Sequence, residues 1–327
     1  MTAADTPTQP EGERPPRILL IDTLRGIALI AMATYHFTWD LEFFGYVDPG
    51  TATQGFFRLY ARSIASSFLF LAGVSLVLAH GRGIRWHAFA KRLAVVAGAA
   101  IAISIATFFI FPQEWIFFGI LHNITVSSLI GLAFLQAPLA IAFAVPILIA
   151  VGMFIDAAIM PGMLQSPLFD TRWLAWIGFA ELTPRSNDYV PLFPWLAALL
   201  AGIAVTRLAI ARGWTSRLAQ LQRKDTLLAK AGRKSLIVYL VHQPILLGLV
   251  YLFWLVSPPD PAASYARGCN AQIQSQGYDI SVSQRFCDCA TRQLTEQSLL
   301  APLTFGKIPA DDERVLSIYK QCSAEIE

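Results

Sequence analysis

The hydrophobic residues of the chain gather in long blocks that are separated by short polar stretches. A membrane-spanning helix needs about 20 apolar residues at a rise of 1.5 Å per residue, and the blocks meet this length. Transmembrane β-strands would instead alternate apolar and polar residues over about ten positions, and no such alternation is seen. The pattern therefore predicts an all-α, polytopic bundle of about seven spans. The predicted spans are residues 18–39, 61–79, 93–111, 116–135, 138–154, 191–210 and 236–256.

Two polar segments flank the predicted membrane domain, which covers residues 18–256. Residues 1–17 are rich in proline and in charged side chains, so we expect a disordered cytoplasmic tail there. After residue 256 the chain continues with the stiff sequence SPPDP and then becomes polar. We expect residues 257–327 to form a separate tail outside the membrane.

Composition and charge place the chain among membrane proteins. Of its 327 residues, 55% are hydrophobic and only 14% are charged, and its mean hydropathy is +0.52. Soluble domains carry roughly 25% charged residues. Lysine and arginine concentrate in the loops that follow the second and the sixth predicted spans, which predicts that these loops and the N-terminus are cytoplasmic. The net charge of +3 is modest, and its place in these loops gives no indication of nucleic-acid binding.

The cysteines of the chain all lie in the polar tail. An even number of cysteines in a predicted external segment is typical of disulfide staples in an oxidising compartment. Three pairings are possible, and the single residue between Cys287 and Cys289 argues against a bond between these two. A zinc site is disfavoured, because the Cys-Asp-Cys spacing is too short and the tail contains no histidine. The apolar pattern of residues 283–297 predicts a helical tail. The cysteines are Cys269, Cys287, Cys289 and Cys322.

Ionisable residues inside the first predicted span are costly in lipid and are therefore functional candidates. Asp22 and Arg25 are three positions apart on one helical face. They form either a structural ion pair or part of a cytoplasmic site for a phosphate or a nucleotide. His36 and Asp40 are four positions apart near the outer end of the span, where the carboxylate can orient the imidazole as a general base. The alternative is a polar cap at the membrane surface.

Three further polar positions lie in or next to later spans. His122 precedes Asn123 in the fourth span, and His242 precedes Gln243 in the seventh. These side chains either bridge helices by hydrogen bonds or line one polar cavity together with His36. Asp188 lies just before the sixth span in a segment that two prolines interrupt, so it lies either at the outer mouth of a site or in an ordinary helix start.

Six short stretches between residues 17 and 256 occur together, and the full set indicates one protein family more specifically than any single stretch does. They read RILLIDTLRGIA from Arg17, YHFTWDL from Tyr35, SFLFLAGVSL from Ser67, GILH from Gly119, DYVPLFPW from Asp188, and GRKSL from Gly232 with Tyr239 and the HQP at His242. Together they resemble the catalytic-domain family of heparan-α-glucosaminide N-acetyltransferase, in particular its bacterial branch.

The resemblance implies a membrane acyltransferase that takes acetyl from cytoplasmic acetyl-CoA and delivers it to a sugar or glycan acceptor on the far side of a bacterial inner membrane. In characterised relatives a histidine in the loop after the first span acts as acetyl carrier or base. Residues 41–60 contain no histidine, and His36 is the nearest one. His36 does not match the position of that histidine. From the chemistry of the residues we predict His36 as base or acetyl carrier, Asp40 as the group that orients it, His122 as its partner or as an oxyanion stabiliser, and His242 as a further catalytic residue. We predict Asp22, Arg25, Asn123, Asp188, Arg233 and Lys234 as binding residues, with Arg25, Arg233 and Lys234 at the CoA phosphates.

Two other functions fit the same residues. A transporter or flippase would use the polar positions as a substrate path, although the chain shows no obvious inverted halves. A membrane anchor would present the cysteine tail to a partner. In each case the expected contacts are membrane lipid and a small-molecule or glycan substrate, and no metal is expected. An oligomer is compatible with the sequence.

Overall fold

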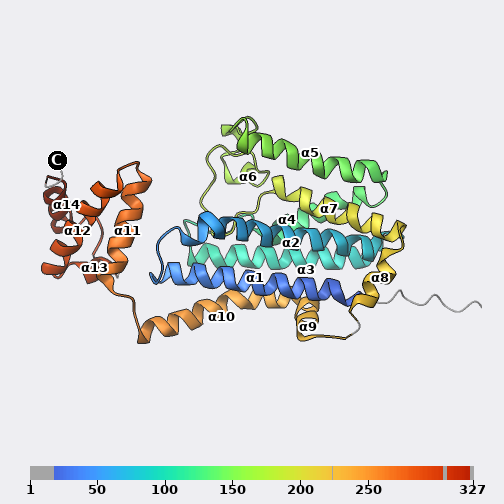
Figure 1. Cartoon of the computed structure of the whole chain (residues 1–327), viewed down its shortest axis with the longest axis horizontal. Helices are drawn as coiled ribbons and strands as arrows, with labels where there is room; N and C mark the ends of the chain where they lie inside the picture. The colour runs from blue at the N-terminus through green and yellow to red at the C-terminus, as the bar shows by residue number, and fades with distance from the viewer. Residues whose placement is uncertain (1–17, 223, 305–307, 325–327) are drawn as a thin grey trace, which may run out of the picture. The chain divides into compact units, whose positions relative to one another are not determined.

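The computed structural model describes residues 18–222, 224–304 and 308–324, and its regular elements there are helices together with two isolated β-bridges. The expected disordered tail over residues 1–17 lies outside the described residues. Figure 1 labels the helices along the chain. They are α1 Leu19–Phe43, η1 Thr51–Thr53, α2 Gly55–His80, α3 Trp86–Ile110, α4 Ile120–Phe134, α5 Leu139–Ala158, η2 Pro167–Phe169, α6 Arg172–Ala175, α7 Leu192–Ala211, α8 Trp214–Leu221, α9 Leu227–Arg233, α10 Ser235–Val256, α11 Pro261–Ser275, α12 Ile280–Glu296, α13 Leu300–Thr304 and α14 Glu313–Ala324.

Six of the described helices are long and apolar enough to cross a membrane, namely α1, α2, α3, α5, α7 and α10. On α3 and α10 large apolar side chains such as Phe109 and Leu252 are exposed, as lipid-facing positions are. The protein is therefore an integral membrane protein. The remaining predicted span, residues 116–135, contains the shorter α4, which begins at Ile120. It starts late because Phe118 pairs in an extended conformation with Tyr189.

The chain divides into two compact units, which we describe separately. Unit 1 consists of residues 1–29 and 65–236, and unit 2 of residues 30–64 and 237–327. In unit 1, α4 contacts both α3 and α7, and α7 also contacts α5, so these helices lie side by side (Figure 1). In unit 2, α11 contacts α12 and α13, and α12 contacts α14.

Two glycines bring α2 and α7 into close contact in unit 1. A β-carbon on Gly73 would lie 2.1 Å from the backbone oxygen of Leu199, and one on Gly202 would lie 2.1 Å from the backbone oxygen of Phe70. Small residues at a crossing let two membrane helices approach and gain van der Waals contact, which drives their association in lipid. The reciprocal arrangement explains why both positions require glycine.

Gly202→Ala is expected to destabilise the protein by about 1–3 kcal/mol, because the added methyl group meets backbone that cannot move aside. Gly98→Ala on α3 is the matched control, since a β-carbon there would have no heavy atom within 4 Å. In the control, alanine should stabilise the helix by about 0.5–1 kcal/mol. Thermal unfolding in detergent measures both variants. Equal shifts for the two would contradict the proposed role of the close crossing.

The C-terminal tail is helical and contains two disulfides. Cys269 pairs with Cys287, and Cys289 pairs with Cys322. The expectation that Cys287 and Cys289 do not bond to each other is confirmed. The prediction of helix over residues 283–297 is confirmed by α12, and Leu294 on this helix is fully buried. The tail core also contains Ala290, Leu299, Leu300, Val315 and Ile318, with Phe286 and Tyr319 packed against it.

Candidate functional site

Two histidines from distant parts of the sequence meet in unit 2. His36 lies on α1 and His242 on α10, and their ring centroids are 5.0 Å apart with the rings tilted by 61°. Aromatic rings stand next to both, since Tyr35 contacts His36 edge-on and Tyr239 contacts His242 at 5.8 Å between centroids. Of the predicted candidates, the structure therefore brings His36 and His242 together directly.

The protonation of the His242 ring follows from its hydrogen bond. Its Nδ1 lies 2.6 Å from the backbone oxygen of Tyr239, one turn earlier in α10. A carbonyl oxygen only accepts, so Nδ1 carries the hydrogen and donates it. In the neutral ring the lone pair then lies on Nε2. This Nε2 atom is buried and has no hydrogen-bond partner among the described residues.

Asp40 and Gln243 extend this cluster. Asp40 lies one turn after His36 on α1 and is fully buried. Its Oδ1 accepts a hydrogen bond of 2.7 Å from Nε2 of Gln243, the residue after His242. The Oδ2 of Asp40 and the Oε1 of Gln243 are buried without a hydrogen-bond partner in the part of the chain that the structure describes. Asp40 therefore connects α1 to α10 rather than bonding to His36, the contact that the sequence spacing suggested.

The cluster leaves three acceptor atoms unused, namely Asp40 Oδ2, Gln243 Oε1 and His242 Nε2. A buried polar atom without a partner costs free energy, and native structures rarely keep one without a bound molecule or water to satisfy it. Because all three atoms accept, the molecule that completes the site must donate N–H or O–H groups. An amine or a hydroxyl has this property.

His122 has a different environment, in unit 1. Its Nδ1 accepts a hydrogen bond of 3.2 Å from the backbone N–H of Gly119. Its Nε2 lies 3.1 Å from Oγ of Ser104, which itself donates to the backbone oxygen of Ile116 at 2.6 Å. Nε2 therefore carries the hydrogen and donates to Ser104. The bond at Nδ1 caps the start of α4, and the bond at Nε2 connects this start to α3.

Asn123 is fully buried and its amide is likewise used within the protein. Its Nδ2 donates to the backbone oxygens of Val190 at 3.1 Å and Pro191 at 2.6 Å. Its Oδ1 accepts from Oγ of Ser127 at 2.7 Å. These bonds fix the segment that leads into α7, and both the nitrogen and the oxygen of the amide have protein partners.

Asp188 lies in the same segment and faces the N-terminus of α4. Its Oδ2 accepts a hydrogen bond of 3.1 Å from the backbone N–H of Ile120. Burial raises the pKa of the Asp188 carboxyl to about 6, and the bond from Ile120 opposes this rise. A carboxylate at this place satisfies one of the free N–H groups of the helix start. This contact belongs to the start of α4, whereas the sequence suggested the start of the sixth span, so both interpretations of Asp188 stay predictions.

The predicted ion pair of the first span is present in unit 1. Nη1 of Arg25 lies 2.9 Å from Oδ1 of Asp22, whose side chain is buried. The other guanidinium nitrogen of Arg25 donates to Oγ of Ser75 on α2, a partner that the sequence did not indicate. The pair therefore joins α1 to α2 at the first turns of α1.

Three of the basic residues after the sixth span, namely Lys230, Arg233 and Lys234, lie on and just beyond α9. This helix lies close against α1, since a β-carbon on Gly232 would lie 1.8 Å from the backbone oxygen of Asp22. Arg233 and Lys234 are exposed at the end of α9, and Lys230 one turn earlier is exposed as well. Arg233 pairs with Asp225 at 2.5 Å. The negative end of the helix dipole stabilises cations at this place, and lysine and arginine are side chains that bind phosphate groups.

Comparison with known proteins gives one result. Residues 17–244 match the family model described as heparan-alpha-glucosaminide N-acetyltransferase, catalytic. The match covers well over half of the chain and contains all the polar clusters described above, but not the cysteine tail. No curated protein and no solved structure matches the chain.

Proposed function

The chain belongs to the family of heparan-α-glucosaminide N-acetyltransferase catalytic domains, and on this premise we propose that it transfers an acetyl group from cytoplasmic acetyl-CoA to a sugar or glycan acceptor on the other side of the membrane. Membership of the family supports a membrane-bound acetyltransferase. The acceptor, and the residues that carry out the transfer, are part of the proposal.

The observation that carries the proposal is the set of unused acceptors at His242, Asp40 and Gln243. Acetyl transfer needs an attacking amine or hydroxyl, and such a group donates the hydrogen bonds that these atoms lack. Asp40 Oδ2 and Gln243 Oε1 would accept hydrogen bonds from neighbouring hydroxyl groups of the acceptor sugar. His242 Nε2 would face the hydrogen that has to leave.

We assign the general base to His242. As the acceptor nitrogen or oxygen attacks the thioester carbonyl, Nε2 of His242 takes its proton and the C–S bond breaks. The proton then passes from Nε2 to the departing CoA thiolate, which leaves as the thiol and restores the neutral base. The bond from Nδ1 to the Tyr239 carbonyl holds the ring in the tautomer that this step needs. His36 borders the ring of His242, and we assign it to positioning that ring or to carrying the acetyl group.

The remaining candidate residues fall into two groups, those that bind the donor and those that position the helices. We propose that Arg25, Arg233 and Lys234 hold the CoA phosphates, since Arg233 and Lys234 are exposed cations and the guanidinium of Arg25 is one-fifth exposed. The polar atoms of Asn123 and His122 form hydrogen bonds within the protein, so we propose that these residues position α4 and the start of α7.

The orientation that we propose places the N-terminus and the basic end of α9 in the cytoplasm, and the tail in the periplasm of a bacterial inner membrane. The distribution of lysine and arginine supports the first part. The two disulfides of the tail support the second, because disulfides persist in oxidising compartments.

The proposal is tested by CoA release from radiolabelled acetyl-CoA, with purified protein in liposomes and a lysate as a source of acceptors. Release of CoA together with label on a non-protein product is the expected result. Movement of a labelled sugar across the liposome membrane without CoA release would instead support a transporter and overturn the proposal.

A further inference from the structure

The loop that follows α1 is fixed to the start of the cysteine tail within unit 2. Oη of Tyr46 donates to the backbone oxygen of Ser257 at 2.7 Å. Gly45 has a positive φ of 80°, and a β-carbon there would lie 2.6 Å from Oγ of Ser264 on α11. Only glycine combines this backbone conformation with so close an approach. The loop and α11 are therefore in close contact at Gly45.

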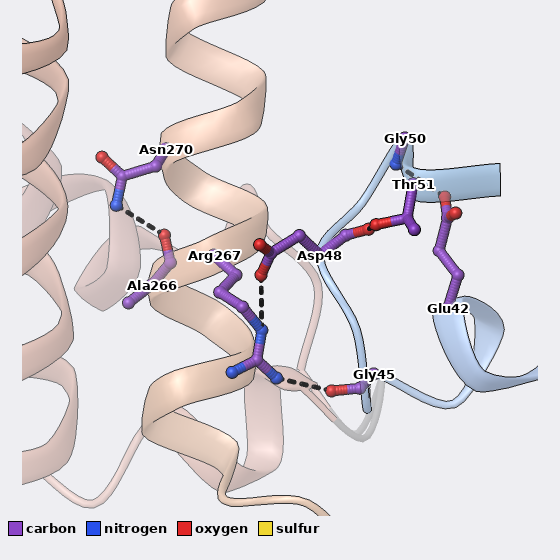
Figure 2. Close-up of polar contacts among 8 residues, drawn as sticks. All are labelled: Glu42, Gly45, Asp48, Gly50, Thr51, Ala266, Arg267 and Asn270. Carbon is purple, nitrogen blue, oxygen red and sulfur yellow. Dashed lines mark hydrogen bonds and ion pairs between the residues drawn. The ribbon is translucent and has the colours of Figure 1, made fainter. Parts of the chain in front are cut away.

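Arg267 on α11 binds the same loop by two groups, as Figure 2 shows. Its Nη2 donates to the backbone oxygen of Gly45 at 2.6 Å, and its Nε lies 3.2 Å from Oδ1 of Asp48. The loop itself is held in shape by Glu42, whose carboxylate accepts from the backbone N–H groups of Gly50 and Ala52, both at 2.7 Å. The loop side of the contact is thus preorganised.

A cleft of about 630 Å³ opens beside this contact. Its volume lies in the range of small-molecule binding sites, about 300–1,000 Å³. Arg267, Asn270 and Gln274 recur at intervals of three and four residues, so one face of α11 forms one wall. Polar side chains dominate the lining, which includes Asp48 and Gln54 from the loop side, Arg267, Asn270 and Gln274 from α11, and Gln284 from α12.

The lining matches a ligand that is polar but uncharged. Its charged side chains, Asp48 and Arg267, pair with each other, so no excess charge remains for an anion or a cation. The other polar groups are mostly amides, which both donate and accept. Oδ1 of Asn270 is buried without a hydrogen-bond partner among the described residues, while its Nδ2 donates to the backbone oxygen of Ala266 at 2.8 Å. This orphan acceptor needs a donor such as a hydroxyl group.

The cleft lies beyond the ends of the helices that carry the histidines. From His36 to Phe43, the last residue of α1, there are seven steps along the helix, or roughly 10 Å, and the loop that lines the cleft follows. A single sugar at the histidines would not span this distance.

We propose that the cleft is a remote subsite that holds an uncharged, hydroxyl-rich glycan chain whose end is acetylated at the histidines. This inference rests on the proposed function. The tail, which lies outside the matched family region, then supplies part of the substrate-binding surface.

The test is equilibrium binding to the full-length protein in nanodiscs, which needs no turnover. The probes are the uncharged β-1,4-linked tetramer of N-acetylglucosamine, the monomer, and a sulfated heparan tetrasaccharide. The neutral tetramer should bind more tightly than the other two. Asn270→Ala and Gln54→Ala should each weaken its binding by about tenfold, the effect of one or two lost hydrogen bonds, and leave the monomer unaffected.

Gln272→Ala is the matched control, since Gln272 is exposed on α11 outside the cleft lining. It should bind the tetramer as the wild type does. Gln54 lies outside the tail, so its substitution tests the cleft even where a change in α11 disturbs folding. Three results would overturn the subsite. The first is tetramer binding that neither cleft substitution weakens, and the second is no tetramer binding at millimolar concentration. The third is tighter binding of the sulfated chain than of the neutral tetramer. Each of these outcomes is independent of CoA release, which tests acetyl transfer itself.

Discussion

His242→Ala is expected to lower the rate of acetyl transfer by about 10²–10⁴-fold, the contribution of a positioned general base. The ring has one fixed tautomer, because its Nδ1–H is donated to the Tyr239 carbonyl, and its Nε2 is buried without another partner. Alanine removes the nitrogen to which we assign the proton. CoA release in liposomes measures the effect, with the amount of inserted protein determined for each variant.

Two further histidine variants give this prediction its controls. His87→Ala changes an exposed histidine at the start of α3, outside the cluster, and should keep full activity. His36→Ala removes the neighbouring ring but leaves the Nδ1 bond of His242, so a base at His242 predicts a smaller loss than His242→Ala causes. A larger loss in His36→Ala would move the catalytic role to His36, and wild-type activity in His242→Ala would remove His242 from the mechanism.

The sequence predicted the elements of the fold well because each follows from local information. Length and hydropathy identify a spanning helix, and the three-residue interval between Asp22 and Arg25 predicts their pair, which is present. The fourth span was predicted too long, because the extended pairing of Phe118 with Tyr189 depends on a segment 71 positions away in the sequence. Such pairings leave no trace in the local pattern.

The candidate site could be predicted only in part for the same reason. Spacing suggested a bond between His36 and Asp40 on one helix, whereas Asp40 bonds to Gln243 on another. Which residues face each other across two helices depends on their rotation and register, and periodicity alone gives neither. The adjacency of Gln243 and His242 was a visible signal, since two polar residues side by side in an apolar helix are expensive in lipid. The role of Arg267 had no such signal, because arginine in a polar segment is ordinary.

The pairing of the cysteines also depends on helix packing, and it leads to the second large expected effect. Replacing both Cys289 and Cys322 by serine should destabilise the tail by about 4 kcal/mol, since this disulfide closes a loop of 33 residues in the unfolded chain. Replacing Cys269 and Cys287, which are separated by 18 residues, should cost about 3 kcal/mol. Changing both partners together avoids leaving a reactive thiol.

A helical domain of this size has only a few kcal/mol of net stability from its core, so the loss of the Cys289–Cys322 bond should unfold the tail at 37 °C. Hydrogen exchange on the full-length protein in nanodiscs would show this as loss of protection in α12 and α14, which contain Leu294 and Ile318. The Cys269 and Cys287 variant should lose protection mainly in α11, since that bond ties α11 to α12. Wild-type protection in both variants would show that the core keeps the tail folded without the disulfides.

Because α11 carries Arg267 and Asn270, both variants should also lose tetramer binding. Acetyl transfer to a monomeric acceptor should continue, which separates the role of the tail from the chemistry at His242.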